Sequence, residues 1–408
     1  MALKASADPQ GVDRRTVLKG MAAAGTAFAA LTGYQPLVFA QDNVLRIGWI
    51  KATTGKAVST YSTIFAGGLV AIEEINQAGG INGRKVVPFE LDDEGSPSTQ
   101  PAIVRRLVEE KIGIAAGPGG SSQALSSLAG TSPNKILSTT YALSEELGDG
   151  TKYPYHYQFV FNTRAQAEAA VDYLVDKRGL KKIGILQEQT AFGEALTKTT
   201  TELLEKRGLK PTIVQTVPLV ATAVLPNVSN IKNSGAEALC AWVSLVPAYG
   251  LTFKALADLD WTPTLICHIS AMTETLFEMA PEKVFKDAVA TAYKTLTWTD
   301  SEAIGARQLA YLEKVKQIPN MIGNEPLAMM APFYDYLHAL KKVADEKKSV
   351  DPAVLKEGMD ALTNYDAMLG KVSFSAINHS GHSASSIALA KLLSARDSRA
   401  RGIFRERA

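Results

Sequence analysis

The sequence predicts an α/β protein whose parallel sheets are covered by helices on both faces. Three observations support this prediction. Short apolar segments alternate with helix-like segments, glycine-rich turns separate several of them, and the alternation extends through two successive series. Such alternation is typical of βαβ units, which build parallel sheets.

The first series occupies residues 45 to 140. One helical stretch ends in the Gly-Gly pair at 79–80, a common place for a helix C-terminus. The expected elements, in order, are strand 45–50, helix 61–80, strand 85–93, helix 97–111, strand 112–117, a glycine-rich loop with its helix, and strand 135–140.

The second series repeats this pattern. Its expected elements are helix 165–179, strand 181–188, a helix ending at Gly208, strand 212–219, a further helix, and strands 238–243 and 264–269. Segment 287–293 then leads into two or three more helices between 300 and 362, and a polar, short-stranded motif at 369–384 follows. We therefore expect two similar α/β units in succession.

Residues 1–40 are expected to be a twin-arginine export signal. Arg14 and Arg15 precede an uncharged, alanine-rich stretch, and Val38-Phe39-Ala40 stands before Gln41. A basic start, a short apolar region and small residues at the cleavage site are typical of such a signal. We expect the mature chain in the periplasm or cell exterior, and its roughly 368 residues suffice for two domains.

The mature part of the chain is expected to be electrically neutral. Without residues 1–40 it has 39 basic and 39 acidic residues. This balance argues against nucleic acid as a partner and against a polybasic membrane-binding patch. No later stretch has the length and apolarity of a membrane span.

Cysteine and histidine spacing predicts neither a disulfide framework nor a metal site. Cys240 and Cys267 each lie in an apolar expected strand, so we expect two buried thiols, with a bridge between them as the alternative. His379 and His382 stand three residues apart, but no cysteine or acidic cluster joins them. We expect no metal and no cofactor.

The stretch GPGGSSQ at 117–123 predicts an anion site. It lies between an expected strand and an expected helix, where the free N–H groups and the helix dipole favour a negative group. Gly120 permits close backbone approach, and Ser121 and Ser122 can cap the helix or bind a ligand. A capped helix with an empty loop fits these residues equally well. No Walker A or dinucleotide motif is present, so a small carboxylate fits better than a nucleotide.

Several motifs in the right order give the chain a family resemblance. It resembles the type I periplasmic binding proteins of the leucine/isoleucine/valine-binding family, the solute-binding components of ABC importers. The matching stretches are 53–86, which includes INQAGGINGR, 91–107 with DDEGSP, 117–127 with GPGGSSQALSS, 186–196 with LQEQTAFGEAL, and 369–382 with LGKVSFSAINHSGH.

The resemblance implies two doubly wound lobes joined by three crossover strands, with ligand held in the cleft between them. Carried onto this sequence, the crossovers fall near 159–163, 290–295 and 372–374, and helices 300–362 return to the first lobe. The implied lobes are residues 41–160 with 294–371, and residues 161–293 with 372–408.

The resemblance also implies site residues. The ligand carboxylate would bind at Ser121, and a second contact would come from Ala142; the usual threonine is replaced by Leu143, for which Tyr141 or Ser144 would compensate. The full expected set is Tyr61, Gly120, Ser121, Ser122, Tyr141, Ala142, Ser144, Phe192, Ser244, Tyr249 and His268. Each aromatic residue in this set has ordinary core packing as its alternative.

The segment CHISAM at 267–272 bears on the ligand. Amino-acid binders of the family hold the ligand ammonium with an acidic residue here, but this segment has none, and a buried ammonium without a counter-charge costs several kcal/mol. We therefore expect an aromatic or short branched carboxylic acid, and a branched-chain amino acid second. An acidic residue entering the pocket from elsewhere in the chain would contradict this reasoning.

The resemblance implies a membrane permease as partner and no catalysis. Asp92, Asp93 and Glu94 are interpreted as fixing a loop and capping the next helix, because the family has the same acidic run without activity. Ser121 and Ser122 lack the GxSxG context of a nucleophile. A ligand-sensing receptor subunit of the same fold is the alternative function.

Overall fold

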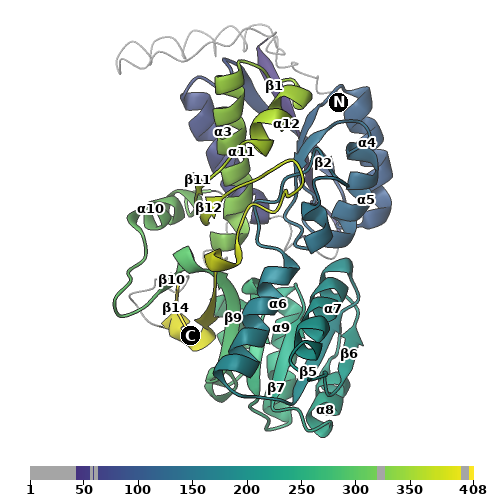
Figure 1. The fold of residues 1–408 in the computed structure, drawn as a ribbon, viewed down its shortest axis with the longest axis vertical. Helices are drawn as coiled ribbons and strands as arrows, with labels where there is room; N and C mark the ends of the chain where they lie inside the picture. The colour runs from purple at the N-terminus through teal and green to yellow at the C-terminus, as the bar shows by residue number, and fades with distance from the viewer. Residues whose placement is uncertain (1–42, 56–57, 59–62, 319–326, 397–403) are drawn as a thin grey trace, which may run out of the picture. The chain divides into compact units, whose positions relative to one another are not determined.

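Two mainly parallel sheets form the framework of the protein (Figure 1). The computed structural model describes residues 43–55, 58, 63–318, 327–396 and 404–408, and the compact unit Val44–Ala408 contains all the elements below. The expected export signal and Tyr61 lie outside the described residues.

The first sheet has four strands in the order β2-β1-β3-β4, all parallel. They are β1 (Val44–Lys51), β2 (Lys85–Asp92), β3 (Ile114–Ala116) and β4 (Leu137–Thr139). The strands β3 and β4 are fully buried, β3 as an inner strand of the sheet and β4 as its edge strand.

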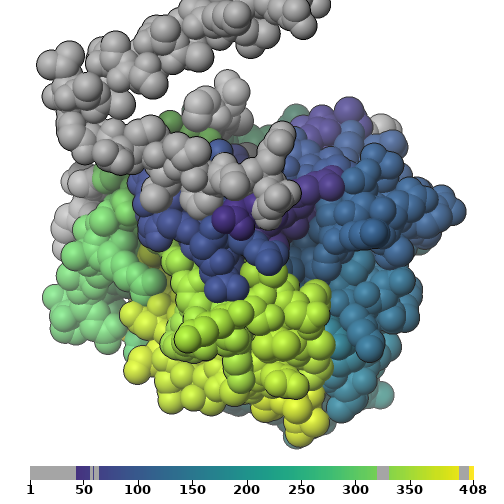
Figure 2. All heavy atoms as spheres, turned by 90° about the horizontal axis from the view of Figure 1, so that it is seen from above, coloured from purple at the N-terminus to yellow at the C-terminus, as the bar shows by residue number. Residues whose placement is uncertain are grey.

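Helices from both ends of the chain cover this sheet. They are α3 (Ala66–Gln77), α4 (Gln100–Glu109), α5 (Ser121–Thr131), α11 (Leu327–Lys347) and α12 (Pro352–Asp360), with η1 (Thr63–Phe65) and η2 (Pro97–Thr99). A Cβ on Gly67 of α3 would lie 2.0 Å from the carbonyl oxygen of Met330, so glycine lets α3 and α11 approach closely. Figure 2 shows the yellow-green C-terminal helices against the blue N-terminal segments.

The second sheet has six strands in the order β13-β9-β8-β7-β5-β6. They are β5 (Ile183–Glu188), β6 (Val214–Val217), β7 (Ala238–Trp242), β8 (Thr264–Cys267), β9 (Ala288–Tyr293) and β13 (Ile387–Lys391). All neighbours pair in parallel except β13, which joins β9 antiparallel at the edge. The sequence did not predict this antiparallel strand.

The helices of the second sheet alternate with its strands. They are α6 (Thr163–Val171), which continues into the π-helix η4 (Asp172–Lys177), and α7 (Ala191–Glu205), α8 (Leu225–Asn233) and α9 (Val246–Asp258). Asn162 and Thr190 start α6 and α7 by accepting hydrogen bonds from the backbone N–H groups of Ala165 and Gly193.

The remaining elements are short, apart from α10. They are α10 (Ala306–Val315), the parallel pair β10 (Thr297–Trp298) and β14 (Arg405–Glu406), the antiparallel hairpin β11 (Tyr365–Ala367) and β12 (Gly370–Val372), and the 3₁₀ turns η3 (Glu145–Gly148), η5 (Ile269–Ala271), η6 (Glu274–Glu278), η7 (Glu282–Phe285), η8 (Lys294–Leu296), η9 (Ala384–Ser386) and η10 (Leu392–Arg396).

The predicted α/β class with two parallel-sheet units is confirmed. The chain leaves the first sheet after β4, returns to it after β9, and reaches the second sheet again at β13. Helices α10, α11 and α12 follow the second series, and α10 and α11 pack against α3, as expected for helices that return to the first sheet. The residue numbers at which the lobes divide stay a prediction.

The two cysteines are buried free thiols, as expected. In the register of β7 and β8, Cys240 pairs with Ile266 and Cys267 pairs with Ala241. Successive side chains in a strand point to opposite faces, so the two thiols project from opposite faces of the sheet. In the described part of the chain, no helix combines the length and apolarity needed to cross a membrane.

Candidate functional site

A cavity of about 430 Å³, including its mouth, lies among loops of both sheets. The first sheet contributes residues that follow β3 and β4, and the second contributes residues at or after the ends of β5, β7 and β8. The lining residues are Gly119, Gly120, Ser121, Ser122, Gln123, Tyr141, Leu143, Glu188, Thr190, Phe192, Ser244 and His268. Ligands of open parallel sheets bind at the carboxyl ends of the strands, so this cavity is the candidate ligand site.

The structure brings most of the expected site residues together at this cavity. Those that line it are Gly120, Ser121, Ser122, Tyr141, Phe192, Ser244 and His268. Ala142, Ser144 and Tyr249 are not among its lining residues, and Tyr61 is outside the described part of the chain.

Helix α5 begins at the cavity. Its N-cap residue Gly120 has extended backbone angles and makes no side-chain cap, so no side chain covers the N–H groups of the first turn. Gly117, where the glycine-rich stretch starts, has φ of 98°, and a Cβ there would lie 2.0 Å from the carbonyl oxygen of Ile50. Glycine is therefore required where β3 turns towards α5.

The two serines at the start of α5 connect different parts of the site. Ser121 Oγ accepts hydrogen bonds from the backbone N–H groups of Leu143 and Ser144, each at 3.2 Å. Ser122 Oγ accepts a hydrogen bond of 3.1 Å from the backbone N–H of Ala191, the first residue of α7. The serines thus tie the first turn of α5 to the loop after β4 and to the second sheet.

Hydrogen bonds to Thr140 and Gln158 hold the loop after β4 in place. The N–H of Ala142 donates to Thr140 Oγ1 at 3.3 Å, and the carbonyl oxygen of Ala142 accepts a hydrogen bond of 3.0 Å from Gln158 Nε2. Gln158 Nε2 also donates to the carbonyl oxygen of Ser144 at 3.0 Å. Ala142 and Ser144 therefore shape the loop that presents Tyr141 and Leu143 to the cavity.

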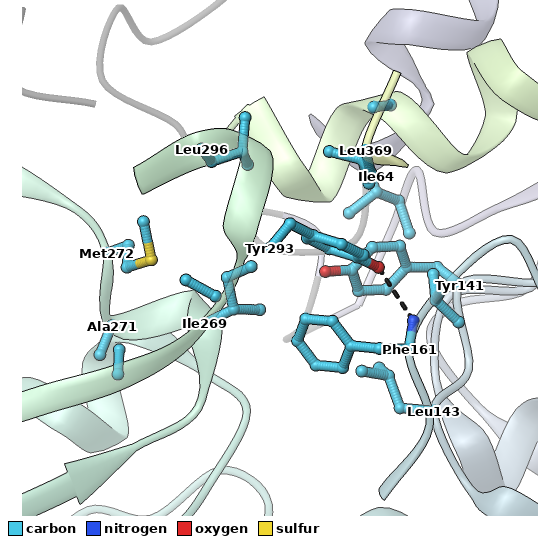
Figure 3. Close-up of a cluster of buried hydrophobic side chains, with 14 of the residues drawn as sticks. Ile64, Tyr141, Leu143, Phe161, Ile269, Ala271, Met272, Tyr293, Leu296 and Leu369 are labelled. Carbon is cyan, nitrogen blue, oxygen red and sulfur yellow. Dashed lines mark hydrogen bonds between the residues drawn. The ribbon is translucent and has the colours of Figure 1, made fainter. Parts of the chain in front are cut away.

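An apolar cluster adjoins the cavity (Figure 3). Tyr141 lies beside Tyr293, and the Tyr293 hydroxyl accepts a hydrogen bond of 2.9 Å from the backbone N–H of Phe161. Leu143 lies below them, and Ile269 lies on the side of the second sheet. Burial raises the pKa of the Tyr141 hydroxyl, so this group stays protonated in the physiological range.

His268 forms part of the second-sheet wall. Its Nδ1 lies 2.7 Å from Gln166 Oε1, and its backbone N–H donates to the Tyr249 hydroxyl at 2.7 Å. The Phe192 ring meets the His268 ring edge-on at 4.9 Å. Burial lowers the pKa of His268 to about 3, so the imidazole is neutral at pH 7. Tyr249 thus supports His268 from outside the lining.

Glu188 also lines the cavity, although it is not among the site residues expected from the sequence. Its carboxylate accepts from the Ser244 backbone N–H at 2.7 Å, from the Ser244 hydroxyl at 2.8 and 3.0 Å, and from the Thr190 hydroxyl at 2.7 Å. Burial raises the pKa of Glu188, although these hydrogen bonds oppose the shift.

The reasoning that a ligand ammonium would find no counter-charge in the pocket is therefore contradicted. Glu188 comes from the end of β5, whereas that reasoning considered only the segment after β8. The sequence pattern that indicates Glu188 is an acidic residue at the end of an apolar strand, because ligands bind at the carboxyl ends of the strands in a parallel sheet.

The acidic run at the end of β2 fixes the loop, as interpreted, but it does not cap the next helix, because Ser96 is the N-cap of η2 and Thr99 that of α4. Asp92 accepts hydrogen bonds from the backbone N–H groups of Thr53 and Thr54, and Asp93 accepts from the backbone N–H of Gly95. Burial alone would raise the pKa of Asp92, but these and further hydrogen bonds hold it well below its usual range. Among the described residues, no group of three His, Cys, Asp or Glu side chains is arranged to hold a metal ion.

Comparisons with known proteins agree with this architecture. A family model described as periplasmic binding protein matches residues 44–396. A Leu/Ile/Val-binding protein homolog 1 from Brucella abortus (strain 2308) is 25% identical over 360 residues, which are 86% of this chain and 90% of that protein.

Two solved structures share the fold. The branched-chain amino acid transporter substrate binding protein LivJ of Streptococcus pneumoniae, in complex with isoleucine, has a TM-score of 0.72 and 16% identity, covering 85% of this chain and 96% of that one. A solute binding protein of an ABC transporter from Rhodopseudomonas palustris BisB5, in complex with 3,4-dihydroxy benzoic acid, has a TM-score of 0.71 and 18% identity, covering 86% and 93%. The family match, the relatives and the shared fold confirm the resemblance predicted from the sequence motifs: the chain belongs to the periplasmic binding protein family, with the type I, Leu/Ile/Val-binding proteins as its relatives.

Proposed function

We propose that the chain is the substrate-binding component of an ABC importer and that it captures a small organic acid in the cavity between its two sheets. The observation that carries the proposal is the start of α5, whose uncapped first turn lines a cavity closed on the other side by the second sheet.

The carboxylate of the ligand would bind at this helix start. The first-turn N–H groups and the helix dipole favour an anion, and the hydroxyl hydrogens of Ser121 and Ser122 add two donors. Charge-assisted hydrogen bonds contribute about 1.5–3 kcal/mol each. Two or three of them with apolar burial reach the roughly −8 kcal/mol of micromolar affinity.

The body of the ligand would meet an apolar and aromatic wall. Tyr141, Leu143 and Phe192 line the cavity beside the carboxylate position. These side chains favour an aromatic or branched-chain carboxylic acid.

A branched-chain amino acid is the second candidate, and Glu188 is the observation that favours it. A carboxylate at the cavity supplies the negative charge that a ligand ammonium requires. The Leu/Ile/Val-binding relative and the isoleucine complex of LivJ agree with this candidate. We rank it second because Thr190 and Ser244 already donate to both oxygens of Glu188.

The proposed mechanism is a binding equilibrium without catalysis. Lobes formed by residues 41–160 with 294–371 and by residues 161–293 with 372–408 would close around the ligand, because it contacts both. The closed form would dock on an inner-membrane permease, after export of the folded chain by a twin-arginine signal at residues 1–40. A ligand-sensing receptor subunit is the alternative role of the same binding event.

A ligand screen tests this function. The protein without residues 1–40 is tested by thermal shift and calorimetry against aromatic acids, aliphatic acids, amino acids, sugars and nucleotides. We expect micromolar binding of at least one acid and none of sugars or nucleotides. Exclusive binding of sugars or nucleotides would contradict the proposal, and conversion of a bound acid into a product would contradict the absence of catalysis.

A further inference from the structure

The second-sheet wall of the cavity presents hydrogen-bond acceptors. The hydroxyl groups of Ser244 and Thr190 both donate their hydrogens to the Glu188 carboxylate. Thr190 Oγ1 also accepts a hydrogen bond from the backbone N–H of Gly193 at the start of its own helix. Ser244 Oγ keeps lone pairs, and it lines the cavity.

His268 adds a second acceptor to this wall. Gln166 Oε1 lies 2.7 Å from His268 Nδ1 and 3.1 Å from the Thr291 hydroxyl, and this orientation of the Gln166 amide requires the ring proton of His268 on Nδ1. The neutral ring then carries a lone pair on Nε2. Within the described residues Nε2 has no hydrogen-bond partner, and His268 lines the cavity.

The first-sheet wall presents donors. The oxygens of Ser121 and Ser122 accept backbone N–H groups, which leaves their hydroxyl hydrogens for other acceptors. The N–H groups of the first turn of α5 are further donors at this wall. The cavity is thus polarised, with donors on one wall and acceptors on the other.

We propose that the ligand is a hydroxylated carboxylic acid, and that His268 Nε2 accepts its hydroxyl group while the start of α5 holds its carboxylate. This inference rests on the proposed function and narrows its ligand class. His268 is then the specificity residue, because an acid without the hydroxyl leaves the buried Nε2 unpaired.

A neutral hydroxyl fits this wall better than an ammonium. An ammonium has three N–H donors and a full charge. Besides Nε2 of a neutral His268 and Ser244 Oγ, this wall offers it the lone-pair site of Glu188 that Thr190 and Ser244 leave. Both oxygens of Glu188 already accept hydrogen bonds within 3.0 Å from Thr190 and Ser244. A hydroxyl needs one acceptor, which His268 supplies.

Matched ligands test the inference by calorimetry. The aromatic set is benzoate, 3-hydroxybenzoate, 4-hydroxybenzoate and 4-methoxybenzoate, and the aliphatic set is 4-methylpentanoate, 2-hydroxy-4-methylpentanoate and leucine. We expect a hydroxylated acid to bind at least about tenfold tighter than its unsubstituted and methoxy counterparts, since one buried hydrogen bond contributes about that factor. Equal binding of the unsubstituted or methoxy acid would overturn the inference and leave the proposed function standing.

The other ligand outcomes separate the two proposals. If leucine binds more tightly than both aliphatic acids, the hydroxyl inference is overturned and the amino-acid candidate of the proposed function holds. If no acid binds, the proposed function fails together with the inference.

A variant assigns the effect to His268. His268→Phe keeps a ring beside Phe192 but removes Nε2, so hydroxylated and unsubstituted acids should bind this variant equally. His338→Asn, a change of the histidine that bonds Glu74 away from the cavity, should keep the full preference. Retention of the preference in His268→Phe would overturn the role of His268, and the unsubstituted acid reports whether the variant still folds and binds.

The ring proton is tested separately. Long-range ¹⁵N–¹H spectra of histidine-labelled protein, with the His268→Phe variant for assignment, distinguish a proton on Nδ1 from one on Nε2. We expect the Nδ1–H form at pH 7. If the Gln166 amide had the opposite orientation, its NH₂ group would donate to His268 Nδ1 and the ring proton would lie on Nε2. His268 would then be a donor to the ligand, and this result would overturn the inference.

Discussion

Ser121 shows how one side chain serves both the fold and the proposed site. Its oxygen accepts two backbone N–H groups of the loop after β4, while its helix presents first-turn N–H groups to the cavity. The family resemblance predicts a ligand role for Ser121, but no sequence pattern indicates that Ser121 also anchors residues 143–144, because these contacts join residues 22 and 23 positions apart.

Replacing Ser121 should weaken binding more than stability. Ser121→Ala removes a donor to the ligand carboxylate and loosens the loop after β4, so we expect affinity for the bound acid to fall by about tenfold or more. Ser126→Ala, on the same helix but bonded to the carbonyl oxygen of Pro97, should bind as the parent does. Calorimetry gives both affinities; equal affinity of Ser121→Ala and the parent would show that the carboxylate lies elsewhere.

Asp335 makes stability depend on pH. This buried carboxyl accepts a hydrogen bond of 2.6 Å from the Met368 N–H, and burial raises its pKa from 3.8 to about 7, although that hydrogen bond and Arg307 oppose the shift. The folded state therefore holds the proton more tightly than the unfolded state. The stabilisation is fully present below pH 3.8 and is lost as the pH rises through about 7.

Asp335→Asn should remove this dependence. The amide keeps an oxygen for Met368 and carries no charge, so the variant should exceed the parent in free energy of unfolding at pH 8 by on the order of a few kcal/mol. Asp345→Asn, at a more exposed position of α11, should keep the parental slope. Urea denaturation at pH 5 and pH 8 measures both, and an unchanged slope in Asp335→Asn would contradict the assignment.

At the scale of elements, a segment near the C-terminus supports the loop after β4. Gln158 donates to the carbonyl oxygens of Ala142 and Ser144, and its Oε1 accepts from the Ser380 hydroxyl at 2.7 Å. The backbone of Gln158 also pairs with His379 and Gly381. The crossover after β4 and residues 379–381 thus position the loop that presents Tyr141.

Gln158→Leu should therefore lower affinity as well as stability. It leaves two buried carbonyl groups and Ser380 without a partner, which costs about 1–3 kcal/mol for each unsatisfied group. Because the loop after β4 loses its support, ligand affinity should fall by more than in Gln187→Leu, whose side chain bonds Thr216 at the surface. Chemical denaturation and calorimetry separate the two effects; a loss of stability with parental affinity would rule out a positioning role.

The sequence predicts elements well where local patterns determine them. Apolar runs such as 238–243 and the glycine-rich turn at 117–120 specify the strands of a parallel sheet and the start of α5. The antiparallel strand β13 and the partners of Gln158 and Glu188 were not predictable, because pairing between distant segments leaves no periodicity in either one. The proposed ligand role of Ser121 rests on the family resemblance.

At the scale of the whole molecule, a direct hydrogen bond joins a helix of the first sheet to a helix of the second sheet at the site. Ser122 on α5 accepts from the backbone N–H of Ala191 on α7, and both helices start at the cavity. Since this bond joins the two sides of the cavity, it should stabilise the closed arrangement with or without ligand.

Ser122→Ala should therefore speed ligand release. The variant loses the bond to Ala191 and, at the proposed site, a donor to the ligand carboxylate, and each hydrogen bond of about 0.5–1.5 kcal/mol corresponds to roughly two- to tenfold faster dissociation if the association rate is preserved. Stopped-flow displacement measures this rate, with Ser126→Ala as the parental control. A dissociation rate unchanged by Ser122→Ala would show that this contact does not hold the site closed.

The claim that a carboxylate is held at the start of α5 is tested most directly by the tightest-binding acid of the screen and its methyl ester. Calorimetric titration of the protein without residues 1–40 should give micromolar affinity for the acid and at least about 100-fold weaker binding of the ester, because the ester lacks the charge that the helix start favours. Equal affinity for acid and ester would contradict the account.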